Sequence, residues 1–240
     1  MELPKGLEIT WYGHSTFVVQ TPNGTRIMID PWLKDNPACP AALKSDPGPV
    51  DVILITHPHF DHVDEADLVP LAKANDSTVV AIIETAGWVR SLGVTNIIEM
   101  NIGGTVEIAD SRVHMTHAAH SAGIRDGDGY RYGGVATGFV VEAPDGFGIY
   151  FAGDTAAFSD MTLIGKLLEP DIAVLPIGDR VTMGPRSAAE AIRMLGVGTV
   201  IPFHYDTLPG LTGTPEQLVL ETRDIKGLEI IELKPGATLR

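Results

Sequence analysis

The chain has 240 residues, of which 44% are hydrophobic and 20% are charged; this balance is typical of a folded globular protein and excludes a disordered chain. Lysine and arginine number 17 against 31 aspartates and glutamates, a formal charge of −14, which opposes binding to long nucleic acids because that binding needs basic side chains. A single cysteine, Cys39, excludes an internal disulfide framework and a cysteine-rich metal site.

We expect a cytoplasmic protein that does not bind membranes. Residues 1–6 have neither the basic region nor the apolar stretch of a signal peptide. No apolar run approaches the roughly 20 residues that a membrane span needs. A chain of this length can bury its own core, so one domain over residues 1–240 is expected, and a homo-oligomer is compatible with the sequence.

Two stretches rich in proline or glycine are predicted to be surface loops. Residues 36–49 hold four prolines, and residues 121–134 hold five glycines. Both compositions disfavour regular structure, and the second indicates a mobile loop. Within it, residues 126–129 (Asp-Gly-Asp-Gly) are interpreted as a turn, because no glutamate follows at the spacing of a calcium-binding loop.

An internal repeat is the most informative feature of the organisation. Phe-Val-Val-Gln-Thr-Pro-Asn-Gly at residues 17–24 returns as Phe-Val-Val-Glu-Ala-Pro-Asp-Gly at residues 139–146. Each copy predicts a strand and a tight turn, followed by an apolar strand that ends in an aspartate, Asp30 or Asp154. Apolar runs, typical of strands covered on both faces, also recur at residues 50–56 and 170–176. We therefore expect two similar halves, about residues 1–120 and 121–240; a chance likeness between two hairpins is the alternative.

Capping signals predict helices between the strands. They cover residues 64–74, 85–92, 159–168, 185–195 and 214–225. Thr85 and Ser159 are expected at N-caps, Pro185 at a first helical position, and residues 214–217 as a capping box. Strands that alternate with helices in two repeated halves predict an α/β (α+β) fold, a four-layer αββα sandwich with two sheets face to face.

One short run carries most of the chemical information. Directly after a predicted strand, residues 56–62 read Thr-His-Pro-His-Phe-Asp-His and bring together His57, His59, Asp61 and His62. Imidazole and carboxylate groups are the ligand types that suit zinc and related metals. In an extended chain His57 and His59 face the same way, whereas Asp61 and His62 need a turn and could face a second ion. The run therefore predicts a metal site.

Further candidate ligands stand at other predicted strand ends. His204 ends the apolar run 199–204, and His120 follows the strand at residues 112–116. Asp154 occupies a repeat position roughly equivalent to that of Asp30. Because a carboxylate can bridge two ions, Asp154 is the best-placed bridging candidate.

The run from His57 to His62 resembles the signature of the metallo-β-lactamase superfamily. The resemblance covers nearly the whole chain, since Asp30, the histidine run, His120, Asp154 and His204 follow in the family's order. Shorter motifs resemble a branch of metal-dependent hydrolases related to L-ascorbate-6-phosphate lactonase; they are Gly13-His-Ser, Ala119-His-Ser and residues 153–161, 176–179, 182–185 and 202–205. The branch motifs indicate membership and do not name a substrate.

The resemblance implies a role for each matching residue. His57, His59 and His120 would hold one ion; Asp61, His62 and His204 would hold a second; Asp154 would bridge them; and Asp30 would orient a ligand histidine through a hydrogen bond. At the third motif His120 is preferred to His117, because Ala-His-Ser matches the branch, and His117 stays open as the alternative. His114 is interpreted as an ordinary residue.

Other residues are candidates for catalysis and substrate binding. The resemblance puts His14 near the metals, where it would contact substrate or donate a proton; a turn histidine bonded to backbone is the alternative. Asp61 is also expected to steer a proton. Candidates for the pocket rim flank the motifs, and an ordinary structural role is the alternative for each of them: Ser121, Thr155, Arg180, Thr182 and Tyr205.

These observations predict a hydrolase with two divalent ions, in which a shared hydroxide cleaves a small ester, lactone or phosphoester. Zinc is preferred, with manganese, iron, cobalt or nickel as alternatives. His59, where di-iron relatives usually carry glutamate, favours hydrolysis, and Asp154 and His204 lie too close in sequence for an inserted nuclease domain. The expected partner is a small, anionic substrate. A nuclease or cyclic-nucleotide phosphodiesterase on the same site, and a non-catalytic metal-binding protein, are the alternatives.

Overall fold

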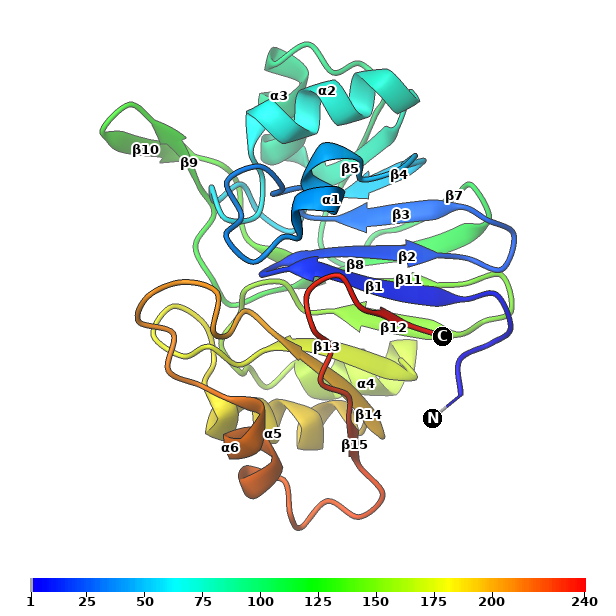
Figure 1. The fold of residues 1–240 in the computed structure, drawn as a ribbon, viewed down its shortest axis with the longest axis vertical. Helices are drawn as coiled ribbons and strands as arrows, with labels where there is room; N and C mark the ends of the chain where they lie inside the picture. Colours follow the sequence, from blue (N-terminus) through cyan, green and yellow to red (C-terminus); the bar gives the residue numbers. More distant parts are fainter. Residues whose placement is uncertain (1) are drawn as a thin grey trace.

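The computed structural model describes residues 2–240 (Figure 1). Within these residues the strands form two seven-stranded sheets and one two-stranded hairpin. The first sheet runs in the order β16 (Thr238–Leu239), β1 (Glu8–Gly13), β2 (Thr16–Gln20), β3 (Arg26–Ile29), β4 (Val52–Leu54), β5 (Thr78–Ile82) and β6 (Ile97–Met100). The second runs in the order β15 (Glu229–Ile230), β14 (Thr199–Phe203), β13 (Ile172–Pro176), β12 (Gly148–Phe151), β11 (Thr137–Glu142), β8 (Ser111–His117) and β7 (Thr105–Ile108).

Helices cover the outer face of each sheet (Figure 1). The first sheet carries α1 (Ala41–Ser45), α2 (Glu65–Asn75) and α3 (Ile83–Ser91). The second carries α4 (Met161–Leu168), α5 (Pro185–Leu195) and α6 (Pro215–Glu221). The predicted four-layer αββα arrangement is confirmed.

The two copies of the sequence repeat adopt the same local structure. Strands β2 and β3 form an antiparallel hairpin in which Phe17 pairs with Ile29, and β11 and β12 form another in which Phe139 pairs with Phe151. In both halves the second strand of the hairpin then pairs in parallel with the next strand, β3 with β4 and β12 with β13. The repeat therefore places equivalent strand ends at the same edge of the two sheets.

Aromatic side chains join the two sheets. Phe17 on β2 is fully buried, and its ring centroid lies 5.7 Å from that of Phe151 on β12 and 5.8 Å from that of Phe203 on β14. Trp11 on β1 stacks on Phe17 from the same sheet at 6.1 Å. Burial of such large apolar surfaces supplies much of the free energy that holds the layers together.

A second apolar cluster lies between the first sheet and its helices. Leu68 of α2 and Val89 of α3 are buried with Met28 and Ile53 of the sheet. The cluster fixes α2 and α3 beside the loop of residues 55–64, which contains the predicted metal-binding run.

Helix α2 contains a proline at its sixth residue, Pro70, which does not interrupt the helix predicted for this segment. Asp64 caps its start, because the carboxylate accepts the Ala66 N–H at 2.7 Å. Pro70 cannot donate to the Ala66 carbonyl. The Lys34 ammonium donates to that carbonyl instead, at 2.7 Å, and so compensates for the missing helix bond.

Three predicted helix boundaries and two predicted loops need correction. Helix α3 begins at Ile83, directly after β5, so Thr85 lies inside the helix and its hydroxyl donates to the Gly133 carbonyl. Helix α4 begins one residue later than a Ser159 cap would place it, with Asp160 at the N-cap. Helix α6 has the predicted capping box but ends at Glu221, where the Thr222 hydroxyl binds the Leu218 carbonyl.

The predicted loops contain regular structure. Residues 36–49 include the short helix α1. Residues 121–134 form the hairpin of β9 (Gly123–Asp126) and β10 (Gly129–Tyr132), with the predicted turn at residues 126–129. The hairpin stands out from the body of the fold (Figure 1). Among residues 2–240, every helix is too short or too polar to cross a membrane.

Replacing Phe17 with alanine is expected to lower the free energy of unfolding by about 3–5 kcal/mol, because a cavity opens between the sheets. Urea unfolding followed by circular dichroism measures the change. Val219→Ala on α6, where the side chain is 50% exposed, is the control and should change the free energy by less than about 0.5 kcal/mol. A loss for Phe17→Ala no larger than that of the control would contradict a structural role for this ring.

Candidate metal centre

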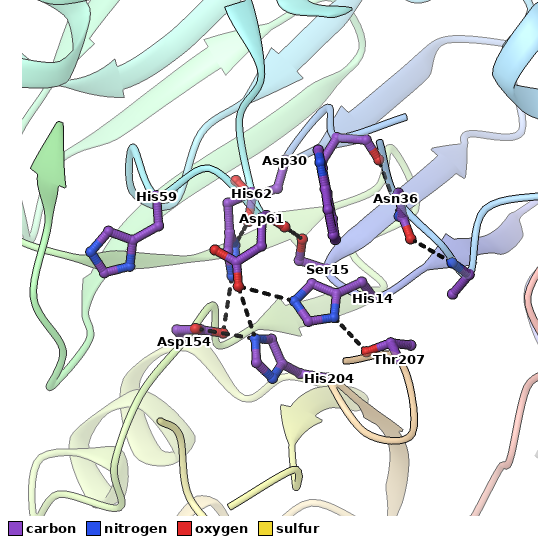
Figure 2. A network of polar contacts seen from close by, with 12 residues as sticks. His14, Ser15, Asp30, Asn36, His59, Asp61, His62, Asp154, His204 and Thr207 are labelled. Atoms are coloured by element: carbon purple, nitrogen blue, oxygen red, sulfur yellow. Dashed lines mark hydrogen bonds and ion pairs between the residues drawn. The ribbon is translucent and has the colours of Figure 1, made fainter. Parts of the chain in front are cut away.

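The site is built at the carboxyl ends of strands from both sheets (Figure 2). Asp30 follows β3, His57 comes three residues after β4, Asp154 follows β12, and His204 follows β14 directly. Because β3 and β4 run parallel, as do β12, β13 and β14, their carboxyl ends lie at one edge of each sheet. This is where α/β proteins most often bind their ligands.

Backbone conformation at three of these positions is unusual. His14, Asp30 and His204 have φ values of 51°, 52° and 56°, a left-handed region that disfavours side chains with a Cβ atom. Such strain costs about 1–3 kcal/mol per residue and concentrates at functional sites. The hydrogen bonds described below hold His14 and Asp30 in place.

Asp154 is positioned by a glycine that no other residue could replace without strain. Gly153 has a φ of 62°, and a Cβ atom there would lie 2.7 Å from the Thr137 carbonyl oxygen and 3.0 Å from the Thr56 Cβ. Thr137 in turn donates its N–H and its hydroxyl to the Thr56 carbonyl, at 3.0 and 2.9 Å. The loops of the two sheets are thus joined directly beside Asp154.

Three histidines form one group of ring nitrogens. His59 Nδ1 lies 2.9 Å from His57 Nε2 and 3.3 Å from His120 Nε2. One nitrogen from each ring falls within 4.8 Å of the others, so the group could hold a metal ion. His57 is buried, whereas His59 and His120 are half-buried and leave this side of the site accessible to solvent.

A second group lies deeper and includes His14 together with Asp61, His62 and His204. Asp61 Oδ2 is 3.2 Å from His14 Nε2 and 3.7 Å from His204 Nε2. Figure 2 shows the His14 and His204 rings side by side below the Asp61 carboxylate, with ring centroids 4.0 Å apart. This group too could hold a metal ion, with His14 as a donor that the family resemblance did not include among the ligands.

Asp154 lies between the two groups. Its carboxylate is 3.1 Å from His62 Nε2 and 3.4 Å from His204 Nε2 in the second group. The same carboxylate is 3.6 Å from His120 Nε2 in the first group. It is the one acidic side chain among residues 2–240 for which contacts to both groups are recorded, as a bridging position requires.

The outward nitrogens of His62 and His14 are held by oxygen atoms. Asp30 Oδ2 lies 2.8 Å from His62 Nδ1, and Thr56 donates its N–H and its hydroxyl to the Asp30 carboxylate at 2.8 and 2.7 Å. The Thr207 hydroxyl contacts His14 Nδ1 in the same way. Bonds of this kind fix the orientation of a ligating ring and direct its other nitrogen inwards. The sequence indicated Asp30 but not Thr56 or Thr207.

Burial sets the charge of the donors. It lowers the pKa of His57 well below its usual value and the pKa values of His59 and His14 to about 4, so these rings are neutral near pH 7. Burial opposes ionisation of Asp61 and Asp154, but the neighbouring histidines outweigh it and lower both pKa values. Neutral imidazoles and ionised carboxylates are the forms that bind metals.

The buried donors fit a bound cation. Burial opposes charge on His62, yet the carboxylates of Asp154 and Asp30 outweigh it and raise the His62 pKa well above its usual value, so this place favours positive charge. Within residues 2–240, both ring nitrogens of His204 are buried without a hydrogen-bond partner, and His62 Nε2 and Asp154 Oδ1, although 3.1 Å apart, lack the geometry of a hydrogen bond. Unsatisfied buried polar atoms are costly, and a divalent ion would satisfy them with the ligand types that zinc and its neighbours prefer.

The remaining predicted site residues lie at different distances from this cluster. Ser121 is exposed, with its hydroxyl 3.4 Å from His59 Nε2. The Thr155 hydroxyl accepts the Ala119 N–H at 2.9 Å and so helps to place the loop of His120. Arg180 is exposed, the Thr182 hydroxyl donates to the Met183 carbonyl, and Tyr205 is buried against Trp11.

His117, the alternative ligand at the third motif, and His114, interpreted as an ordinary residue, both lie apart from the donor groups. His117 is exposed at the end of β8 and packs against Phe158, with ring centroids 5.1 Å apart. His114 contacts the Thr105 hydroxyl and the Glu142 carboxylate. It is His120 that joins His57 and His59.

Comparison with known proteins agrees with this geometry. Residues 25–205 match the model of the Beta-lactamase superfamily domain. A UPF0173 metal-dependent hydrolase from Koribacter versatilis is 49% identical over 234 residues, 98% of each chain. Another from Rubrobacter xylanophilus is 49% identical over 240 residues, covering 99% of this chain and 98% of the relative.

A solved structure shows the same relationship in three dimensions. Igni18, a metallo hydrolase from Ignicoccus hospitalis, superimposes with a TM-score of 0.84 at 30% identity over 97% of both chains. The sequence signature, the αββα fold and the cluster of imidazoles and carboxylates thus agree with the relatives. The chain belongs to the metallo-β-lactamase superfamily and, within it, to the UPF0173 metal-dependent hydrolases.

Proposed function

We propose that this metal-dependent hydrolase uses two divalent ions, preferably zinc, to cleave a small ester, lactone or phosphoester. One observation carries the proposal: the Asp154 carboxylate lies within 3.1–3.6 Å of nitrogens from both donor groups. Two ions that share a carboxylate supply an activated water and polarise the bond to be cleaved. In this proposal His57, His59 and His120 hold one ion, and Asp61, His62 and His204 hold the other.

We assign His14 and Asp61 the handling of a proton. His14 is neutral near pH 7, because burial lowers its pKa to about 4. Because the ionised Asp61 carboxylate can only accept, we place the single ring proton on Nε2, which lies 3.2 Å from Asp61 Oδ2; Nδ1 then accepts from the Thr207 hydroxyl. The Ser15 hydroxyl donates to the Asp61 carbonyl at 2.6 Å and fixes that backbone. The ionised Asp61 carboxylate is thus arranged to accept a proton during the reaction, and the neutral His14 holds that carboxylate in place through the hydrogen bond.

A small substrate fits the charge of the protein better than a polymer does. The net charge of −14 repels a chain of phosphates along its length, whereas two cations can offset this repulsion for one anionic group. The half-buried His59 and His120 leave the site open to solvent, which disfavours a closed structural metal site. For its location we propose the reducing cytoplasm, in keeping with the single, unpaired Cys39.

The ligand assignment is tested by metal analysis of paired variants. Wild-type protein loaded with zinc is expected to hold about two ions per chain by elemental analysis. Asp154→Ala should lower the occupancy of both ions, because it removes the shared carboxylate. His120→Ala should lower metal content, whereas His117→Ala, three residues away, should leave it unchanged. Saturation at one ion that His204→Ala does not alter would contradict the two-ion proposal.

Removal of metal is expected to abolish hydrolysis and leave the fold intact. The donors lie in loops at strand ends, while the core between the sheets is closed by apolar side chains. Circular dichroism of chelated protein should therefore match that of the loaded protein, and added metal should raise the melting temperature through linkage. An unfolded chelated chain would show instead that metal binding supplies the folding energy, as in a zinc finger.

His14→Ala should lower kcat by at least about tenfold while metal content changes little, as expected when a group acts on a proton in the transition state. The assay is a panel of lactones, phosphodiesters, thioesters and β-lactams, run on protein whose metal content has been measured. A loss of one ion in parallel with the loss of turnover would make His14 a ligand instead. Rapid cleavage of long RNA or DNA without activity on small esters would overturn the proposed substrate class.

A further inference from the structure

A pocket of about 480 Å³ adjoins the metal centre. Its size lies within the range of small-molecule sites. Much of its wall is apolar or aromatic, made by Trp32, Phe60, Val63, Trp88, Ile124 and Leu208. These residues come from the loop after β3, the metal-binding run, helix α3, the β9–β10 hairpin and the loop after β14.

The pocket and the metal centre share a wall. Phe60 lies between His59 and Asp61 in the chain, and Pro58 lies between His57 and His59; both line the pocket. Trp32 packs edge-on against Phe60 and, on its other side, against His14, with ring centroids 6.1 and 5.1 Å apart. A molecule whose reacting bond lies at the metals would have to pass over Trp32 and Phe60 to enter this pocket.

Phe60 is unusual because its ring is 52% exposed although its two neighbours in the chain are candidate ligands. An exposed ring beside a reaction centre gains free energy when an apolar group covers it. The hairpin that forms the opposite wall is anchored at its base, where a Cβ atom on Gly133 would lie 2.8 Å from Pro58 Cγ. The wall is thus held close to the metal-binding run.

The charges around the pocket argue against an anionic occupant. Asp35, Asp64 and Glu65 line it against one basic side chain, Arg125. Asp64 is also held by the helix that it caps, since its carboxylate accepts the Ala66 N–H. An anion placed here would face a surplus of carboxylates, whereas an uncharged apolar group would not.

We propose that this pocket binds an uncharged apolar part of the substrate, an alkyl chain or an aromatic ring, while the bond to be cleaved lies at the metals. The inference rests on the proposed hydrolase function and extends it to substrate choice. The substrate is then an ester or lactone with a polar reacting end and an apolar far end, and Phe60 determines the preference for that apolar end.

A matched series of esters tests the preference. Wild-type protein should cleave ethyl hexanoate with a kcat/KM at least about tenfold above that for ethyl acetate, since the longer chain buries more apolar surface. Monoethyl adipate, which carries a carboxylate at the far end, should lose this advantage. Phe60→Ala should lose it too with metal content unchanged, whereas Leu163→Ala on α4, with the same 52% exposure, should keep it. Equal values for the three esters, or a preference that Phe60→Ala retains, would overturn the proposal.

A binding measurement separates the pocket from catalysis. Trp32 and Trp88 line the pocket and are two of the three tryptophans in the chain, so the uncharged quencher 4-nitrobenzyl alcohol should quench the fluorescence of the metal-loaded protein in a saturable manner. Phe60→Ala should weaken this binding by about tenfold, and Leu163→Ala should not. Saturable quenching in a protein that cleaves no ester would refute the proposed function but not the pocket. Quenching that does not saturate, or that Phe60→Ala leaves unchanged, would refute the pocket.

Discussion

The structure depends on carboxylates that are buried at the strand ends among imidazole rings. Asp30 and Asp154 are 1% and 2% exposed, and a buried charge without compensation costs several kcal/mol. Hydrogen bonds from Thr56 and His62 compensate Asp30. Asp154 lies against His62, His204 and His120, and one of its oxygens has no hydrogen-bond partner within residues 2–240. A cation between the donor groups resolves this imbalance, so the metal requirement follows from the way the polar groups are buried.

The internal repeat explains how one fold supplies two different carboxylates. Asp30 and Asp154 each follow the second strand of a repeated hairpin, Asp30 directly after Ile29 and Asp154 three residues after Phe151, so they lie beyond the ends of corresponding strands. Their surroundings differ. Thr56 donates two hydrogen bonds to Asp30, whose carboxylate also contacts His62. Asp154 instead follows Gly153, which packs closely against Thr56 and Thr137, and its carboxylate lies near three imidazoles. Because the two repeated strands have different neighbours, Asp30 supports a ligand histidine while Asp154 is placed where it can contact metal.

The sequence predicted the fold and the main donor groups because their signals are local or repeated. The histidine run is contiguous, Asp154 was found through its likeness to Asp30, and α5 has Pro185 at its start and Gly196 at its end. Thr207 could not be found this way, since its contact with His14 joins residues 193 positions apart and a lone threonine has no distinctive spacing. The sequence did not indicate the β9–β10 hairpin, because its glycines favour a loop. The start of α3 was also missed, because Ile82 at the N-cap gives no capping signal.

The spacer residues of the metal-binding run connect chemistry with substrate choice. His57, His59, Asp61 and His62 face the donor groups, while the intervening Pro58 and Phe60 line the neighbouring pocket. The segment turns after His59, whose carbonyl accepts the His62 and Val63 N–H groups at 3.0 and 2.9 Å, so one short segment can serve both surfaces. Coordination geometry restricts which side chains can serve as ligands, whereas Pro58 and Phe60 can be replaced as long as the backbone conformation of the run is maintained. Substitution at Phe60 could therefore alter substrate preference while the metal centre is preserved, which is a direct route by which members of one hydrolase family could acquire different substrates.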